Sequence, residues 1–184
     1  MASTKELLAA SYLPQKEADK KLSKYGYKYD YDLSSMTDKV LVDPKGNPVV
    51  LHRGSVRVSD WVANNAPLAV GLASYAPRFK QGKEVVSTVK QKYQGRPVTS
   101  VSHSLGGAIG ERSGADKVIT YNKGAGLFDI GKTIKPNQTD IRTKYDLPSA
   151  LSAYQTGGKR IELAGSLNPL ETHKTTQLPD QFFV

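Results

Sequence analysis

A serine at the turn between an apolar strand and a glycine-rich helix is the residue best placed for covalent chemistry. Ser104 stands at the centre of Ser102-His103-Ser104-Leu105-Gly106, within the segment VTSVSHSLGGAIGE. Such a tight strand-to-helix turn holds its central residue in a strained, exposed conformation and aims the hydroxyl above the sheet. Backbone N–H groups at the start of the helix can stabilise a developing oxyanion. The pattern indicates a nucleophile, but a serine that only caps a helix gives the same pattern.

Two blocks of the chain resemble the class 3 (fungal-type) lipases. SHSLGGAIGE is similar to the GHSLGGA signature of that family, with Ser102 in place of the first glycine. Upstream, VVLHRGSVRVSDWV resembles the family's apolar strand, Arg-Gly-Thr/Ser run and Asp/Asn-Trp pair. The resemblance covers roughly Asp38 to Leu178. It implies a serine hydrolase of the α/β-hydrolase superfamily, which cleaves carboxylic esters through an acyl-enzyme.

An activated serine needs a base, and the chain has three histidines. His103 adjoins Ser104, and side chains diverge around the turn, so we expect it to form a structural hydrogen bond beneath the serine. His52 closes an apolar strand and is expected to pack beside the sheet. His173 lies in the loop SLNPLETHKTT after the last predicted strand and is the candidate base. A lone loop histidine can also be only solvent-exposed.

The base needs a carboxylate that orients it, between Ser104 and His173 in the chain. Asp146 follows the predicted strand 141–145, so its side chain would emerge at the carboxyl edge of the sheet. The segment IRTKYDLPSAL also resembles the lipase strand whose following aspartate is the triad acid. Asp140 would begin the strand, at the wrong edge, and Asp129 is the second choice. The other acidic candidates are Asp116, Glu162 and Glu171.

The oxyanion hole needs two hydrogen-bond donors. The turn supplies the backbone N–H of Leu105, and the resemblance assigns the second donor to Ser55, the residue after Arg-Gly. The resemblance also places a lid over 56–67. Trp61 within it is expected to lie over the acyl pocket and to swing out at a lipid surface, although a single tryptophan is more commonly a core anchor.

The elements that must position these residues alternate between strand and helix. Ser3 and Glu6 form a capping-box pattern that opens the N-terminal helices, over 3–25. Periodicity predicts strands over 39–42, 48–52, 98–102, 117–121, 141–145 and 160–163, and helices over 79–93 and 105–112. An irregular connection is expected over 26–34. The chain, 1–184, is thus predicted to be one α/β domain, a compact α/β-hydrolase-like mixed, mostly parallel sheet flanked by helices.

Charge and composition narrow the possible partners. Twenty-six Lys and Arg against seventeen Asp and Glu give a net charge of +9, and the lysines are scattered. This surface favours contact with anionic membrane lipid. Specific binding of nucleic acid is not expected, because apart from the run KYGYKYDY the sequence lacks a clustered basic stripe with interleaved aromatic residues. Without cysteine, disulfides and thiol catalysis are excluded. No stretch approaches the roughly 20 apolar residues of a membrane span, and the N-terminal apolar run is too short for a secretory signal.

The leading prediction is a lipase- or phospholipase-like serine hydrolase that acts on a lipid or other ester, with no metal or organic cofactor. The alternative is a catalytically reduced lipase-like fold that serves as a lipid-binding or structural protein. Ser102 and the small size of the chain favour the alternative. The presence of serine, aspartate and histidine in the family's order favours the enzyme.

Overall fold

One mixed sheet forms the centre of the protein. The computed structural model describes residues 1–56 and 66–183, and in that part of the chain the sheet has seven strands in sequence order. The strands are β1 (Lys28–Asp30), β2 (Asp38–Val42), β3 (Pro48–His52), β4 (Thr99–His103), β5 (Lys117–Tyr121), β6 (Thr133–Thr143) and β7 (Thr156–Leu163). β1, β2 and β3 pair antiparallel, and every neighbouring pair from β3 to β7 is parallel. The predicted mixed, mostly parallel sheet is confirmed.

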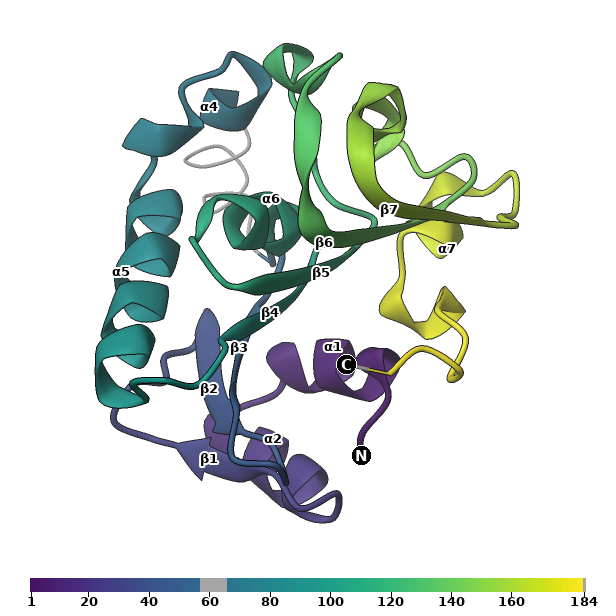
Figure 1. Cartoon of the computed structure of the whole chain (residues 1–184). Helices are drawn as coiled ribbons and strands as arrows, with labels where there is room; N and C mark the ends of the chain where they lie inside the picture. The colour runs from purple at the N-terminus through teal and green to yellow at the C-terminus, as the bar shows by residue number, and fades with distance from the viewer. Residues whose placement is uncertain (57–65, 184) are drawn as a thin grey trace.

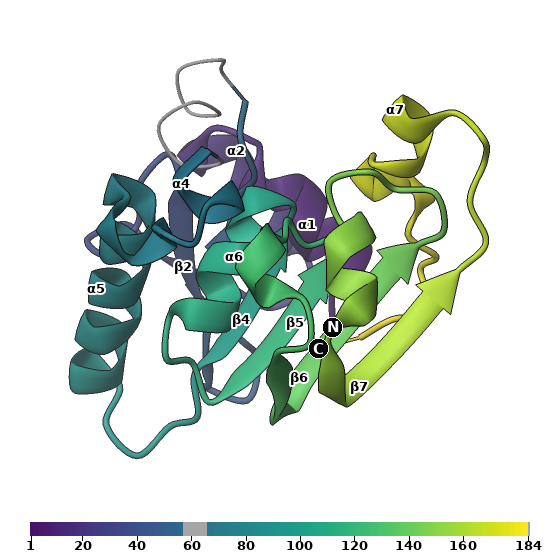
Figure 2. The ribbon, with the colours of Figure 1, turned by 90° about the horizontal axis from the view of Figure 1, so that it is seen from above.

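Helices cover both faces of this sheet (Figure 1, Figure 2). α5 (Pro77–Lys92) and α6 (Leu105–Arg112) pack on one face, and α1 (Thr4–Ser11) with α2 (Gln15–Ser23) packs on the other. The short helices are α4 (Ala66–Ala69), η2 (Ala73–Tyr75), η3 (Leu127–Asp129), η4 (Ala150–Tyr154), α7 (Pro169–Thr172) and η5 (Thr175–Gln177). Among the helices of the described residues, none combines the length and the apolar character needed to cross a bilayer.

The alternating side chains of each strand build a core on both faces. In β3, Val49 and Leu51 belong to the apolar cluster around α1, whereas Val50 packs with Val86 and Val89 of α5. Successive side chains of a strand point to opposite faces, and both faces are covered here, so the three central residues of the strand are all apolar. The central strand β4 is parallel to β3 on one side and to β5 on the other, so whatever follows β4 lies at the middle of the carboxyl edge.

The N-terminal helix is joined to the C-terminal end of the chain. The predicted capping box is present, because the Ser3 hydroxyl accepts from the Glu6 N–H and the Glu6 carboxylate accepts from the Ser3 N–H. The Thr4 N–H donates to the Phe182 carbonyl at 2.7 Å, and Ser3 forms an isolated antiparallel bridge with Phe183. These contacts place the segment after β7 close to α1.

The predicted elements agree with the observed ones except toward the C-terminal half. α6 and β5 have the predicted bounds, and β1 forms within the expected irregular connection by pairing with the edge of β2. β6 begins at Thr133, eight residues before the predicted start, and ends at Thr143. Asp140 therefore lies inside β6, which corrects its expected place at the beginning of the strand. A register shift between Ile134 and Thr139 interrupts the alternation that would have revealed the longer strand.

Lys39 of β2 is buried beneath the C-terminal end of α1. Its ammonium donates to the Ser11 carbonyl at 2.6 Å, and the residue is 1% exposed. Burial and the nearby charge of Arg53 lower the pKa of Lys39 from 10.5 to about 8, although Asp38 acts in the opposite direction. Between these two pH values the unfolded chain holds a proton that the folded chain has released. The free energy of unfolding therefore rises with pH over this range.

The Lys39→Met variant should lack this pH dependence. From pH 8 to pH 10.5 the wild type is expected to gain about 3 kcal/mol of unfolding free energy relative to the variant, because the shift in pKa disappears with the amine. Urea unfolding at the two pH values measures the difference. Lys45→Met removes an exposed lysine and should follow the wild type. Parallel pH curves for Lys39→Met and wild type would contradict the prediction.

Candidate active site

Ser104 occupies a strained turn at the carboxyl end of the central strand. It links β4 to α6 with φ 55° and ψ −127°, in a region that side-chain-bearing residues rarely adopt. In the described part of the chain, two other non-glycine residues have positive φ, Asn122 and Tyr145. Asn122 directly follows β5, and Tyr145 precedes Asp146 two residues after β6. Strained backbone thus gathers at the carboxyl ends of three neighbouring strands, as is common at functional sites.

Glycines of α6 allow this turn to form against the sheet. A Cβ at Gly106 would lie 2.1 Å from the His52 carbonyl oxygen, so only glycine permits the close approach of α6 to the end of β3. A Cβ at Gly110 would lie 2.4 Å from the Ser102 hydroxyl. The serine that replaces the family's first glycine is therefore accommodated by a glycine on the facing helix. Ser102 fits beneath α6 with the turn intact.

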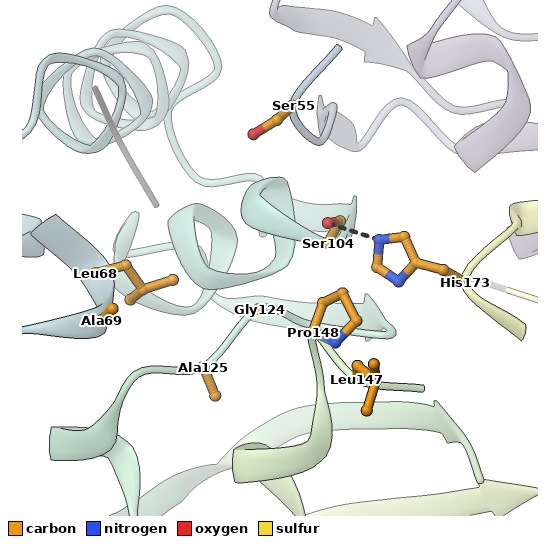
Figure 3. Close-up of a pocket in the computed structure, with 9 residues that line it drawn as sticks. All are labelled: Ser55, Leu68, Ala69, Ser104, Gly124, Ala125, Leu147, Pro148 and His173. Atoms are coloured by element: carbon orange, nitrogen blue, oxygen red, sulfur yellow. Dashed lines mark hydrogen bonds between the residues drawn. The ribbon is translucent and has the colours of Figure 1, made fainter. Parts of the chain in front are cut away.

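Three of the predicted residues come together at this edge of the sheet. The Ser104 hydroxyl lies 2.9 Å from His173 Nε2, and His173 Nδ1 lies 2.6 Å from Asp146 Oδ1. Figure 3 shows the His173 ring directed at the Ser104 hydroxyl. Asp146 is fully buried, and its other carboxylate oxygen accepts the Ser149 N–H at 3.0 Å. The geometry gives His173 an N–H toward the carboxylate and a free lone pair toward the serine.

The rival acidic residues are engaged elsewhere. Asp129 contacts Arg112 at 2.5 Å and Lys132 at 3.6 Å. Asp140 accepts from the Lys123 ammonium at 2.6 Å. Of the carboxylates weighed from the sequence, Asp146 is the one hydrogen-bonded to the His173 ring. It follows β6 after two intervening residues, rather than directly as expected.

The other two histidines are buried and do not contact the serine hydroxyl. His52 Nδ1 lies 2.6 Å from Asp38 Oδ1, and both residues are buried beside the sheet. His103 lies beneath the turn, where Tyr12 and the His173 carbonyl are its hydrogen-bond partners. Both placements match the structural roles expected for these histidines.

An apolar pocket of about 460 Å³ opens beside Ser104 and His173 (Figure 3). It is lined by Ser55, Leu68, Ala69, Ser104, Gly124, Ala125, Leu147, Pro148 and His173. A second hollow of about 390 Å³ shares Ser55, Ser104 and His173 and continues along Tyr12, Thr175 and Thr176. The serine hydroxyl thus lies where two hollows meet.

The predicted oxyanion donors adjoin the same serine. Leu105 is the first residue of α6, and the N–H groups in the first turn of a helix have no acceptor within the helix. Ser55 lines both hollows together with Ser104. Of the predicted lid, 56–67, residues 57–65 with Trp61 lie outside the described residues.

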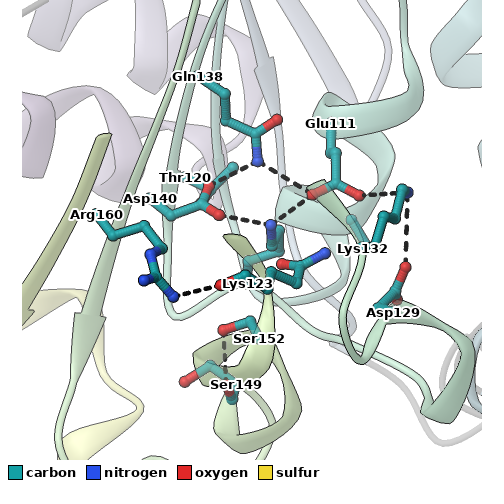
Figure 4. Close-up of polar contacts among 12 residues, drawn as sticks. Glu111, Thr120, Lys123, Asp129, Lys132, Gln138, Asp140, Ser149, Ser152 and Arg160 are labelled. Carbon is teal, nitrogen blue, oxygen red and sulfur yellow. Dashed lines mark hydrogen bonds and ion pairs between the residues drawn. The ribbon is translucent and has the colours of Figure 1, made fainter. Parts of the chain in front are cut away.

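A buried ionic network supports one wall of the pocket (Figure 4). The Lys123 ammonium contacts Glu111 at 2.5 Å and Asp140 at 2.6 Å, and all three residues are buried. Burial opposes the charge of Glu111, but Lys123 and two further basic side chains outweigh it and lower the pKa of Glu111 to about 2. The two residues after Lys123 line the pocket, so the network fixes the backbone of that wall.

Sequence reasoning missed Asn122. The residue is fully buried, and its side chain donates to the Thr172 carbonyl at 2.8 Å and accepts from the Thr143 N–H at 2.7 Å. It thereby joins the segment before His173 to the end of β6. A polar residue directly after an apolar strand at the carboxyl edge was the available signal.

The fold is shared with solved fungal proteins. A mutant form of MDLA from Penicillium cyclopium has a TM-score of 0.54 and 17% identity, over 88% of this chain and 78% of that chain. Lip2 lipase from Yarrowia lipolytica has a TM-score of 0.50 and 14% identity, over 85% of this chain and 77% of that chain. No protein-family model and no curated protein sequence matches this chain. The likeness establishes a fungal-lipase-like α/β-hydrolase fold, as the sequence resemblance predicted.

Proposed function

We propose that this chain, which has the fold of fungal lipases, is a serine carboxylic-ester hydrolase that works through an acyl-enzyme. The observation that carries the proposal is the continuous hydrogen-bonded series from the Ser104 hydroxyl through the His173 ring to Asp146, at 2.9 and 2.6 Å. These distances are those of a nucleophile, a base and the group that orients the base. The strained turn at Ser104 and the adjoining apolar pocket support the same function.

The reaction takes place in two halves. Ser104 Oγ attacks the ester carbonyl carbon while His173 Nε2 takes the hydroxyl proton, and Asp146 stabilises the resulting imidazolium. The N–H of Leu105 and Ser55 stabilise the oxyanion. Collapse breaks the bond to the alcohol, which leaves with the proton from His173. Water, deprotonated by the same base, then attacks the acyl-enzyme and releases the carboxylic acid and the free serine.

The surroundings of the site favour a lipid ester as the substrate. The 460 Å³ pocket suits the acyl chain, because Leu68, Leu147 and Pro148 give it apolar walls, and the second hollow suits the alcohol portion. Leu147 is 67% exposed, and Phe128, which is 73% exposed, lies close to Gly71 just after α4. The exposed Leu147, which lines the pocket, the exposed Phe128 near α4 and a net charge of +9 favour contact with an anionic lipid surface.

Covalent labelling tests the proposal. A fluorophosphonate probe should add once, to the peptide that contains Ser104, and His173→Ala should abolish this adduct because the hydroxyl loses its base. With p-nitrophenyl esters, kcat/KM should rise from acetate to octanoate, by at most about fourfold per buried methylene. A folded wild-type protein that neither forms the adduct nor turns over any of these esters would contradict the hydrolase and favour the lipid-binding alternative.

A further inference from the structure

A chain of hydrogen bonds runs beneath the site from the loop before Ser55 to the backbone of His173. The Gly54 N–H donates to the Tyr12 hydroxyl at 3.0 Å, and that hydroxyl lies 2.6 Å from His103 Nδ1. On the other side of the ring, His103 Nε2 lies 2.8 Å from the His173 carbonyl. The carbonyl can only accept, so Nε2 carries the proton, Nδ1 accepts, and the Tyr12 hydroxyl donates to it. All three hydrogen bonds of the series therefore run in the same direction, from Gly54 through Tyr12 and His103 to the His173 carbonyl.

The segment that carries His173 is held in place through three consecutive backbone carbonyls, each of which accepts a side-chain hydrogen bond. Asn122 donates to the carbonyl of Thr172 at 2.8 Å, His103 to that of His173 at 2.8 Å, and the Tyr121 hydroxyl to that of Lys174 at 3.4 Å. All three donors stand at the carboxyl ends of β4 and β5. His103 differs from the other two donors because its second ring nitrogen is also hydrogen-bonded. Through the Tyr12 hydroxyl it is connected to the loop before Ser55.

We propose that Tyr12 and His103 are positioning residues that hold the His173 backbone and the Ser55-bearing loop in register with Ser104. The inference rests on the proposed function. Tyr12 directly follows α1, and Lys39 binds the carbonyl at the end of that helix. The N-terminal helix is thus a fixed support for two parts of the site that are remote in sequence. Both residues line the second hollow, but in this role their polar atoms bond to protein groups and neither touches the reacting atoms.

The protonation state of His103 suits this role. Burial and the neighbouring His173 ring lower the pKa of His103 to about 3, against the weaker opposite influences of its hydrogen bond to the His173 carbonyl and of Asp146. The rings that pack against it belong to Tyr12, Tyr121 and His173, the last at 4.7 Å between centroids. A neutral His103 keeps its single donor on the His173 carbonyl. It also leaves His173 free to become cationic during catalysis without a second cation beside it.

Kinetics of matched tyrosine variants test the proposal. Tyr12→Phe should lower kcat about tenfold or more, with KM within about twofold of the wild type, because misplaced groups weaken the transition state more than substrate binding. Tyr25→Phe removes a tyrosine hydroxyl that bonds to Glu6 of α1, and it should leave kcat unchanged. His103→Gln keeps a donor and an acceptor and should retain more kcat than His103→Leu. A Tyr12→Phe kcat within twofold of the wild type, or equal losses in both tyrosine variants, would overturn the proposal.

Nuclear magnetic resonance separates this inference from the proposed function. The Nδ1 proton of His173, bonded to Asp146, should shift or broaden in Tyr12→Phe and stay unchanged in Tyr25→Phe. This readout decides the positioning role even if the wild type proves inert toward esters, and an unchanged resonance in Tyr12→Phe overturns it. If thermal unfolding shows that Tyr12→Phe does not fold, the comparison of His103→Gln with His103→Leu decides: equal spectra and equal kcat overturn the proposal.

Discussion

Ser104→Ala is expected to lower kcat against a p-nitrophenyl ester by about 10⁴-fold or more while the protein unfolds at the wild-type temperature. The hydroxyl oxygen is the proposed attacking atom, so its removal leaves only binding and oxyanion stabilisation. The structural cost is small. The hydroxyl is hydrogen-bonded to His173, whose side chain is 26% exposed and can bind water instead. Initial rates and thermal unfolding of the purified variant measure the two effects.

A serine on β4, the strand that leads into Ser104, provides the control. Ser100 of β4 is buried, and its hydroxyl faces Ser102 beneath α6, away from the two hollows that meet at Ser104. Ser100→Ala should keep kcat close to that of the wild type. If Ser104→Ala retained turnover within tenfold of the wild type, the acyl-enzyme mechanism would be wrong.

The sequence predicted the parts of this fold that depend on local patterns. The sequence predicts α6 and β5 with their observed bounds, because turn residues mark the ends of both elements. Ser104 is recognisable in the sequence for the same reason, since strand, turn and helix are adjacent in the chain. Only the last residues of β6 are predicted from the sequence, because the first half of the strand is mostly exposed and polar and its register shifts after Ile134.

The parts that were missed depend on long-range contacts. Tyr12 and His103 are separated by 91 positions, and no pattern near either residue signals the hydrogen bond between them. Asn122 joins residues 21 and 50 positions away. The choice of Asp146 over Asp129 rests largely on the family resemblance, because an acidic residue at the end of a strand is often only a cap. Tertiary packing decides such positions, and a single sequence records them only indirectly.

Asp146 is more than an acceptor for the His173 ring. Its Oδ1 lies 2.6 Å from His173 Nδ1, and its Oδ2 accepts the Ser149 N–H at 3.0 Å. Both contacts require an oxygen, and an asparagine side chain has only one. In Asp146→Asn the fixed backbone N–H at Ser149 would take that oxygen, so the new amide would point its NH₂ at the imidazole. His173 would then carry its proton on Nε2 and could not accept one from Ser104.

Asp146→Asn is therefore expected to lower kcat at neutral pH on the order of 10⁴-fold, with the fold retained, because the base is locked in the wrong tautomer. The matched control is Asp129→Asn, which changes the second acidic candidate in the same way. Asp129 pairs with Arg112 and Lys132, so its variant should lose stability and keep its kcat within a few-fold of the wild type. Ester turnover and thermal unfolding of both variants give the comparison. If Asp129→Asn lost as much kcat as Asp146→Asn, the effect would be one of general disruption, and the assignment of Asp146 as the orienting carboxylate would have to be abandoned.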